Sequence, residues 1–178
     1  MRKISAVLVI LIGICYSCEK KEDPQYRGEI LLSSELMLND QLHSYYGFNF
    51  EDGQISIYSP LSSVQPDLVA IHLIFNQNIS VTLQSSNQVD AFHKNGSFTN
   101  AADAEAYFNS YSEVTAQGFQ GQAENVEVNQ VWTIKTAADK YAKIWIKDIQ
   151  LKTGALSDFV ELTIKYQYQP DGTKTFPG

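Results

Sequence analysis

Four side chains in this sequence are our candidates for binding iron or stacking against a flat ring system. They are His93, Tyr107, Tyr111 and Met37. His93 lies in a predicted loop, AFHKNGSF, where its imidazole is free to reach a metal ion. The two tyrosines are four residues apart, so one face of a helix would present both rings to the same ligand. The alternative for the tyrosines is packing of that helix on a sheet, and for the methionine it is core packing.

The other two histidines are expected to have structural roles. His72 lies in the most apolar segment of the chain, which favours a hydrogen-bonded core histidine over a ligand. His43 stands beside two tyrosines and is predicted to lie at the surface.

No pattern typical of an enzyme is found. No serine or threonine lies in a nucleophile motif, and no glycine-rich phosphate loop follows a predicted strand. The HExxH and CxxC spacings of metal sites are missing as well. We therefore expect a binding protein and not a catalyst.

The N-terminus has the pattern of a secretory signal peptide followed by a lipid-attachment cysteine. A positively charged start precedes an uncharged, mostly apolar run over residues 4–14. As a helix this run is about 16 Å long, too short for a hydrocarbon core of about 30 Å. Ser17-Cys18 resembles a bacterial lipobox, in which cleavage before the cysteine leaves a thiol that carries diacylglycerol. Residues 1–17 are therefore predicted to be a lipoprotein signal peptide and Cys18 the lipidation site, with a plain secreted protein as the alternative.

Residues 18–28 are predicted to be a charged tether, because they offer little to bury. A charged run directly after a lipidated cysteine resembles the export signal of surface lipoproteins in Bacteroidota-type bacteria. This pattern predicts a lipid-anchored protein of the outer membrane that is exposed at the cell surface. Residues 29–178 are expected to form a single domain.

The mature chain is acidic and keeps no reactive thiol. The formal net charge is −7, and removal of the two cations in residues 1–17 would make it −9. Binding to nucleic acid depends on lysine and arginine meeting phosphate, so we exclude a nucleic-acid partner. Cys15 would leave with the signal peptide and Cys18 would be lipidated, which excludes disulfides, zinc sites and thiol nucleophiles.

Alternating hydrophobicity predicts an all-β domain of antiparallel sheets with one short helix. The segments expected as strands or hairpins are 28–39, 48–58, 68–75, 79–83, 131–136, 141–151 and 158–169. The segment 68–75, LVAIHLIF, is apolar on both faces and is predicted to be a central strand covered on both sides. Asn100 is predicted to cap a helix near residues 101–112, and residues 112–130 are expected to be mainly loop.

The last two predicted strands fit together as an antiparallel hairpin centred near Ala155. This register places Ile146 opposite Ile164 and Trp145 opposite Lys165, so apolar residues meet apolar and polar meet polar. The second row of the first strand alternates rings with ammonium groups: Tyr141, Lys143, Trp145 and Lys147. We expect this row to face solvent, with Trp145 as an exposed ring bracketed by lysines.

A family resemblance is carried by residues 131–172, VWTIKTAADKYAKIWIKDIQLKTGALSDFVELTIKYQYQPDG. This segment resembles the C-terminal part of the HmuY family of haem-binding surface lipoproteins, which ends in R-T-A-D-G-x-Y-A-K, a glycine-bearing turn and V-x-F-x-Y-x-Y. Lys140 stands in place of the usual glycine. Weaker matches are YYGFNFEDGQIS and PDLVAIHLIFNQ, in which His72 falls where some members have a histidine that is not a haem ligand.

The resemblance implies an all-β haemophore-like protein that captures haem outside the cell for iron acquisition. It implies an outer-membrane TonB-dependent receptor as the partner that takes over the haem. Haem-binding relatives ligate the iron through histidines or methionines from the middle of the chain, and residues 105–130 contain neither. No ligand is therefore carried over. The other function left open is a surface lipoprotein of the same fold that binds a glycan, through exposed tyrosines and Trp145, or another envelope protein.

Overall fold

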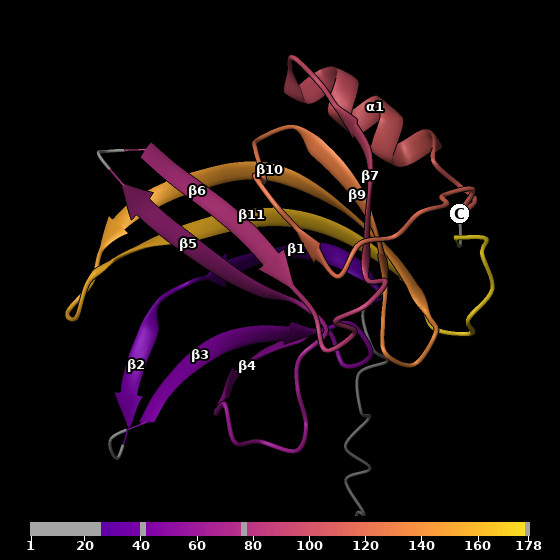
Figure 1. Cartoon of the computed structure of the whole chain (residues 1–178). Helices are drawn as coiled ribbons and strands as arrows, with labels where there is room; N and C mark the ends of the chain where they lie inside the picture. Colours follow the sequence, from indigo (N-terminus) through magenta and orange to yellow (C-terminus); the bar gives the residue numbers. More distant parts are fainter. Residues whose placement is uncertain (1–25, 40–41, 76–77, 177–178) are drawn as a thin grey trace, which may run out of the picture.

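The computed structural model describes residues 26–39, 42–75 and 78–176 and confirms an all-β fold of antiparallel sheets with one short helix (Figure 1). The predicted signal peptide, the lipidation site Cys18 and most of the tether lie outside the described residues. The elements are β1 Arg27–Ser33, β2 Leu36–Asn39, β3 Leu42–Asn49, β4 Gln54–Tyr58, β5 Val69–Phe75, β6 Asn78–Gln84, β7 Phe92–Ser97, α1 Ala101–Ser110, β8 Gln122–Ala123, β9 Gln130–Lys135, β10 Tyr141–Thr153 and β11 Asp158–Gln169.

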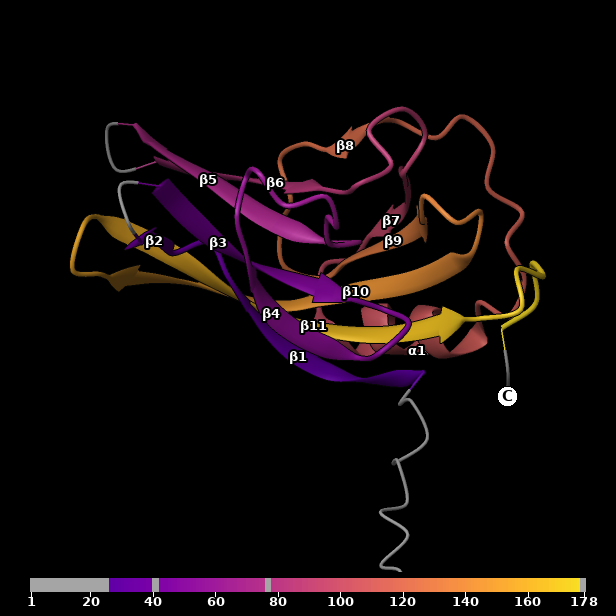
Figure 2. The same ribbon diagram turned by 90° about the horizontal axis from the view of Figure 1, so that it is seen from below.

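The described strands form three sheets. The largest has the order β1-β11-β10-β9-β7, and the two smaller sheets have the orders β2-β3-β4 and β5-β6-β8. The two small sheets lie on one face of the five-stranded sheet and α1 lies on the other, which we call the α1 face (Figure 2). The hairpins β2–β3, β5–β6 and β10–β11 extend toward the same end of the molecule (Figure 1).

The main core fills the space between the five-stranded sheet and the two smaller sheets. Aromatic rings join the layers: Phe48 meets Tyr166 edge-on at 4.9 Å between ring centroids, and Phe50 stacks on Tyr168 at 5.7 Å. All four side chains are buried. Edge-on and stacked pairs of this kind add about 0.5–1.5 kcal/mol each to what their buried area contributes.

The β10–β11 hairpin confirms the register predicted from the sequence. Ile146 pairs with Ile164 and Trp145 with Lys165. A shift at Lys147 then interrupts the ladder, so that Asp148, and not Lys147, faces Thr163. This bulge adds one residue to β10, a feature that alternation of residue types alone does not show.

The middle of the ring and ammonium row of β10, at Lys143 and Trp145, does not face solvent, and for these two residues the prediction is wrong. Trp145 is only 3% exposed and Lys143 only 2%, because α1 and the segment that follows it cover this part of the sheet. The ammonium groups of Lys147 and Lys165 do lie near the Trp145 ring, at 5.6 and 5.8 Å from its centroid. The lysines therefore bracket the ring as expected, but at the border of a second small core.

Helix α1 begins where the capping residue predicts and ends slightly earlier. The Asn100 side chain accepts a hydrogen bond from the backbone N–H of Asp103 at 2.9 Å. Ala104 and Phe108, one turn apart, are buried against the sheet. The last helical residue is Ser110.

Two predictions about individual strands are corrected. The segment 28–39 is two strands in different sheets, because the buried Ser34 between them bonds through its hydroxyl to both backbone groups of Val160. The segment 68–75 forms an edge strand and not a covered central one. Leu73 of β5 is 72% exposed and Ile74 is 41% exposed.

Candidate functional site

A cleft of about 530 Å³ runs along the free edge of β5, and we call it the β5 cleft. Its walls come from the start of β2, from β3, from the loop between β4 and β5, and from the end of β6. The lining residues are Ser34, Leu36, Tyr45, Pro60, Gln65, Pro66, Val69, Ala70, Ile71, His72, Gln84, Ser85, Ser86 and Gln88. None of these residues is an acid, a lysine or an arginine, so the cleft is suited to the apolar part of a ligand and offers it no ion pair.

His72 is the side chain in the β5 cleft that could ligate a metal. Its Nδ1 lies 2.8 Å from the hydroxyl of Ser34, which also accepts a hydrogen bond from the Val160 N–H at 2.9 Å. The Ser34 hydroxyl has one hydrogen, and the Val160 carbonyl lies 3.2 Å away as a second acceptor. When Ser34 donates to that carbonyl, Nδ1 must carry the imidazole hydrogen, and Nε2 then has a free lone pair. A hydrogen bond to one ring nitrogen that orients the other is the arrangement of histidine ligands in metal sites.

The Nε2 atom of His72 has no hydrogen-bond partner among the residues that the structure describes. The ring is half-buried and belongs to β5, where His72 pairs with the buried Val81 of β6. The sequence suggested a hydrogen-bonded core histidine, and the structure confirms the hydrogen bond but places the ring at a cleft.

The opposite wall of the β5 cleft is held by Tyr45. Its hydroxyl donates to Gln65 Oε1 at 2.5 Å, and its ring stacks on Tyr58 at 6.4 Å between centroids. Burial raises the pKa of the Tyr45 hydroxyl, so this side chain is a neutral donor at physiological pH. The lining of the cleft thus includes an aromatic side chain that a hydrogen bond and a stacked ring hold in place.

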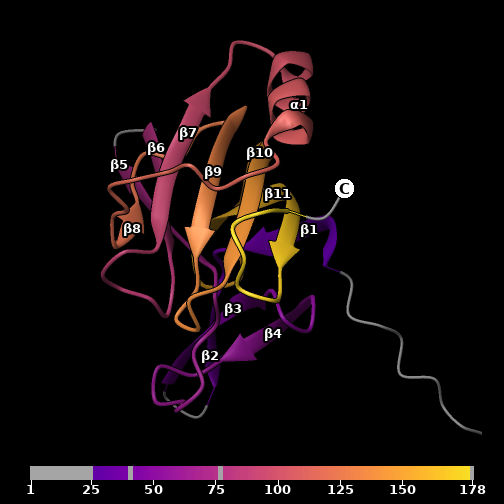
Figure 3. The same cartoon turned by 90° about the vertical axis from the view of Figure 1, so that its right-hand side faces the viewer.

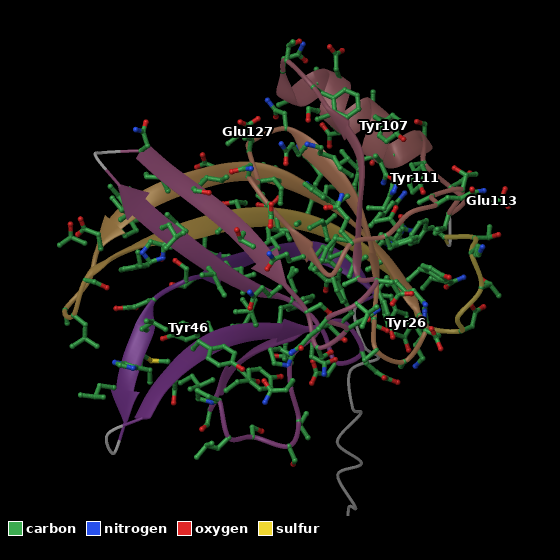
Figure 4. All side chains as sticks on the ribbon, viewed as in Figure 1. Tyr26, Tyr46, Tyr107, Tyr111, Glu113 and Glu127 are labelled. Atoms are coloured by element: carbon green, nitrogen blue, oxygen red, sulfur yellow. The ribbon has the colours of Figure 1, made fainter. Side chains whose placement is uncertain are left out.

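Three of the four residues predicted to bind iron lie together on the α1 face. Tyr107 and Tyr111 project from α1 and the residue after it (Figure 4), and their rings stack at 5.8 Å with an interplanar angle of 16°. The Tyr111 hydroxyl lies 3.2 Å from the hydroxyl of Thr133, which pairs across the strands with His93. Burial, and after it the neighbouring Tyr111, raises the pKa of Tyr107.

The segment after α1 covers this group of residues. It crosses β7, β9 and β10 (Figure 3), and its Phe119 ring lies 5.8 Å from the His93 ring. His93 is half-buried and belongs to β7, not to a loop. Met37 is distant in the fold: it is a half-buried residue of β2 in a different sheet. None of the four lines the β5 cleft.

A second, more polar cleft of about 580 Å³ adjoins the β5 cleft and shares Gln84, Ser85 and Gln88 with it. We call it the amide-lined cleft; the remaining lining residues are Gln120, Gly121, Gln122 and Glu124. Gly121 is required there, because a Cβ atom at this position would lie 2.1 Å from the backbone oxygen of Gln88.

The described residues contain neither a cluster of metal-binding side chains nor a membrane-spanning helix. No three histidine, cysteine, aspartate or glutamate side chains gather there as they would around a metal ion. No helix in the same residues has the length and apolar character needed to cross a bilayer. No family model matches the chain, and a search of curated proteins finds no match either.

Proposed function

We propose that this protein is a lipid-anchored surface protein that binds haem in the β5 cleft, with His72 as the axial ligand of the iron. The observation that carries the proposal is the His72 ring: one nitrogen is held by buried Ser34, and the other is free of partners among the described residues. Such a histidine at an uncharged cleft is suited to a ligand with a large apolar surface and one metal coordination position.

The size and lining of the cleft support this choice of ligand. A volume of about 530 Å³ lies within the usual range for small-molecule and cofactor sites, about 300–1,000 Å³. Leu36, Pro66 and Ile71 offer apolar contacts, and Tyr45 offers a ring. The resemblance of residues 131–172 to haem-binding lipoproteins supports the same function. We propose delivery of the haem to a TonB-dependent receptor on the resemblance alone.

The test is a haemin titration of the purified protein, followed in the Soret and visible bands. We expect saturable one-to-one binding with a shifted Soret band and a largely high-spin spectrum, because a single histidine leaves the iron five-coordinate. His72→Ala should abolish the shift, whereas His93→Ala should leave it unchanged. A shift that persists in His72→Ala but disappears in His93→Ala would move the site to the α1 face. A titration that matches haemin in buffer would exclude haem binding.

A glycan is the second candidate ligand, and the amide-lined cleft favours it. Four glutamine side chains line that cleft and can donate and accept hydrogen bonds to sugar hydroxyl groups: Gln84, Gln88, Gln120 and Gln122. The contact through an exposed Trp145 expected from the sequence is not possible in this structure, because that ring is buried. Retention of the wild-type protein on a glycan array, lost in Gln88→Ala together with Gln122→Ala, would support this ligand.

A further inference from the structure

Just before β5 the chain pairs with β3 at a single position, and this pairing does not continue along β5. Leu68, just before β5, exchanges two backbone hydrogen bonds with Phe48 of β3, at 2.9 and 3.1 Å. Beyond this rung β2 occupies that side of β3, pairing with residues Leu42 to Tyr45. The edge of β5 therefore loses its neighbour within the β5 cleft.

The alternation of an antiparallel strand shows which groups remain open. Because the N–H and C=O of Leu68 point away from β6, the same groups of every second residue point the same way. These residues are Ala70, His72 and Ile74. Within the described part of the chain, no hydrogen bond fills these positions. Three consecutive rungs are thus open, and two of them, at Ala70 and His72, lie within the cleft.

The residue types of β5 do not discourage a further strand from pairing with its free edge. Free edges are commonly blocked by charged residues or proline, which discourage the addition of a further strand. The two edge strands of the five-stranded sheet carry such charges, namely Arg27 and Glu29 in β1 and Lys94 in β7. β5, with the sequence VAIHLIF, contains neither a charged residue nor a proline.

We propose that the free edge of β5 binds an extended, uncharged segment of a partner protein, which adds as a further β-strand along Ala70, His72 and Ile74. Strand addition is an established mode of peptide recognition, in which backbone hydrogen bonds supply affinity and alternate side chains supply specificity. The exposed Ile71 and Leu73 on the outer face of β5 favour apolar residues at alternate positions of the segment.

The recessed position of the edge selects a single segment as the occupant and not a second copy of this chain. Ala70 is only 4% exposed at the base of the cleft, beside Pro66 and Gln65. A second copy would have to bring its own β5, which lies between the same walls. An isolated extended segment has no such walls and can enter.

A peptide binding experiment with backbone-modified probes tests the proposal. The probe is a fluorescein-labelled peptide of eight alternating threonine and valine residues, and its control is the same peptide N-methylated at every second residue. We expect the purified protein to bind the unmodified probe saturably in fluorescence anisotropy and the N-methylated probe at least tenfold more weakly. Equal binding of the two probes, or no binding at about 1 mM, would overturn the proposal.

Two protein variants test the same backbone hydrogen bonds by changing the protein and not the peptide. Ile74→Pro removes one outward N–H, which an edge strand tolerates, whereas Ile74→Ala keeps it. We expect the proline variant to bind the probe at least tenfold more weakly than the alanine variant. His72→Ala should still bind it, because the rung is made by the backbone, and this separates strand addition from haem binding. A concentration-dependent dimer in sedimentation, dispersed by the probe, would instead assign the edge to a second copy.

Discussion

Lys143 shows how much of this fold depends on one buried charge. Its ammonium group donates to the backbone oxygens of Phe108 and Tyr111, both at 2.7 Å, where α1 ends. It also lies 4.8 and 5.1 Å from the ring centroids of Phe108 and Phe176. A cation at this position satisfies carbonyls that the helix leaves without partners and complements the helix dipole. One side chain thus joins β10, α1 and the C-terminal segment.

We expect Lys143→Asp to destabilise the protein by about 3–5 kcal/mol, since it removes the donor and buries an opposite charge beside carbonyl oxygens. The sequence alone predicted a surface position and a cost of less than about 1 kcal/mol. Urea unfolding of the wild-type protein and Lys143→Asp measures the loss of stability and decides between the two values. Lys94→Asp, at an exposed lysine of β7, is the control and should cost less than about 1 kcal/mol.

The same lysine should make stability depend on pH. Burial, and after it the charge of Lys165, lowers the pKa of Lys143 to about 8 from its ordinary value of 10.5. Between these values the unfolded chain binds more protons at this site than the folded protein, so the free energy of unfolding rises with pH from about 8 to about 10.5. Urea melts at pH 7.5 and 9.5 should show this rise relative to Lys143→Met. An identical pH dependence in the variant would show that Lys143 is not the source.

At the scale of the element, the burial of β10 changes along its length. From Ala142 to Ile146 it is buried on both faces, between the main core and α1. Its far half, which pairs with β11 toward the hairpin turn, is much more exposed, and Leu151 there is 48% exposed. A single strand therefore serves as a central element at one end and as an outer hairpin at the other.

A matched pair of aspartate substitutions tests this difference. Ile144→Asp should cost several kcal/mol, because the side chain is fully buried next to Tyr166. Leu151→Asp, on the same strand, should cost less than about 1 kcal/mol, because its side chain already contacts water. Equal losses in urea melts would contradict the gradient of burial along β10.

The sequence predicted the β10–β11 hairpin well because the residues that determine it are close together in the chain. Both strands and the turn lie within residues 141–169, and the alternation of residue types sets their register. The cover over Trp145 was not predictable in the same way. It comes from α1, more than thirty residues earlier, and no periodicity in β10 indicates which distant element packs on it.

The candidate site was predicted less well, for a related reason. His72 gains its orientation from Ser34, which lies between β1 and β2 and is itself held by Val160 of β11; both are far from His72 in the sequence. His93 drew attention because a loop was expected around it, whereas the structure has a strand there. A cleft formed by several segments that are far apart in the sequence cannot be predicted from the pattern of any one of them.

For the whole molecule, the attachment to the membrane remains a prediction from residues 1–28. Lipid on Cys18 would be the main anchor, because acyl chains bind the bilayer stably only in combination. We expect Cys18→Ala to yield an uncleaved, unlipidated precursor. Fractionation of cells after a high-salt wash should find wild-type protein with the envelope and the variant released from it. A variant that stays with the envelope would mean that another attachment dominates.

The pairing of the first described strand with the last determines when the chain can fold. Arg27 of β1 pairs with Gln167 of β11, 140 positions later, and the ladder continues to Ser33 opposite Glu161. A polypeptide emerges from the ribosome with its N-terminus first, so β1 has no neighbour until almost the entire chain has been synthesised. Closing so long a loop is slow, which keeps the nascent chain open. A chain that completes its main sheet only after β11 has been synthesised remains able, until then, to thread through a narrow channel.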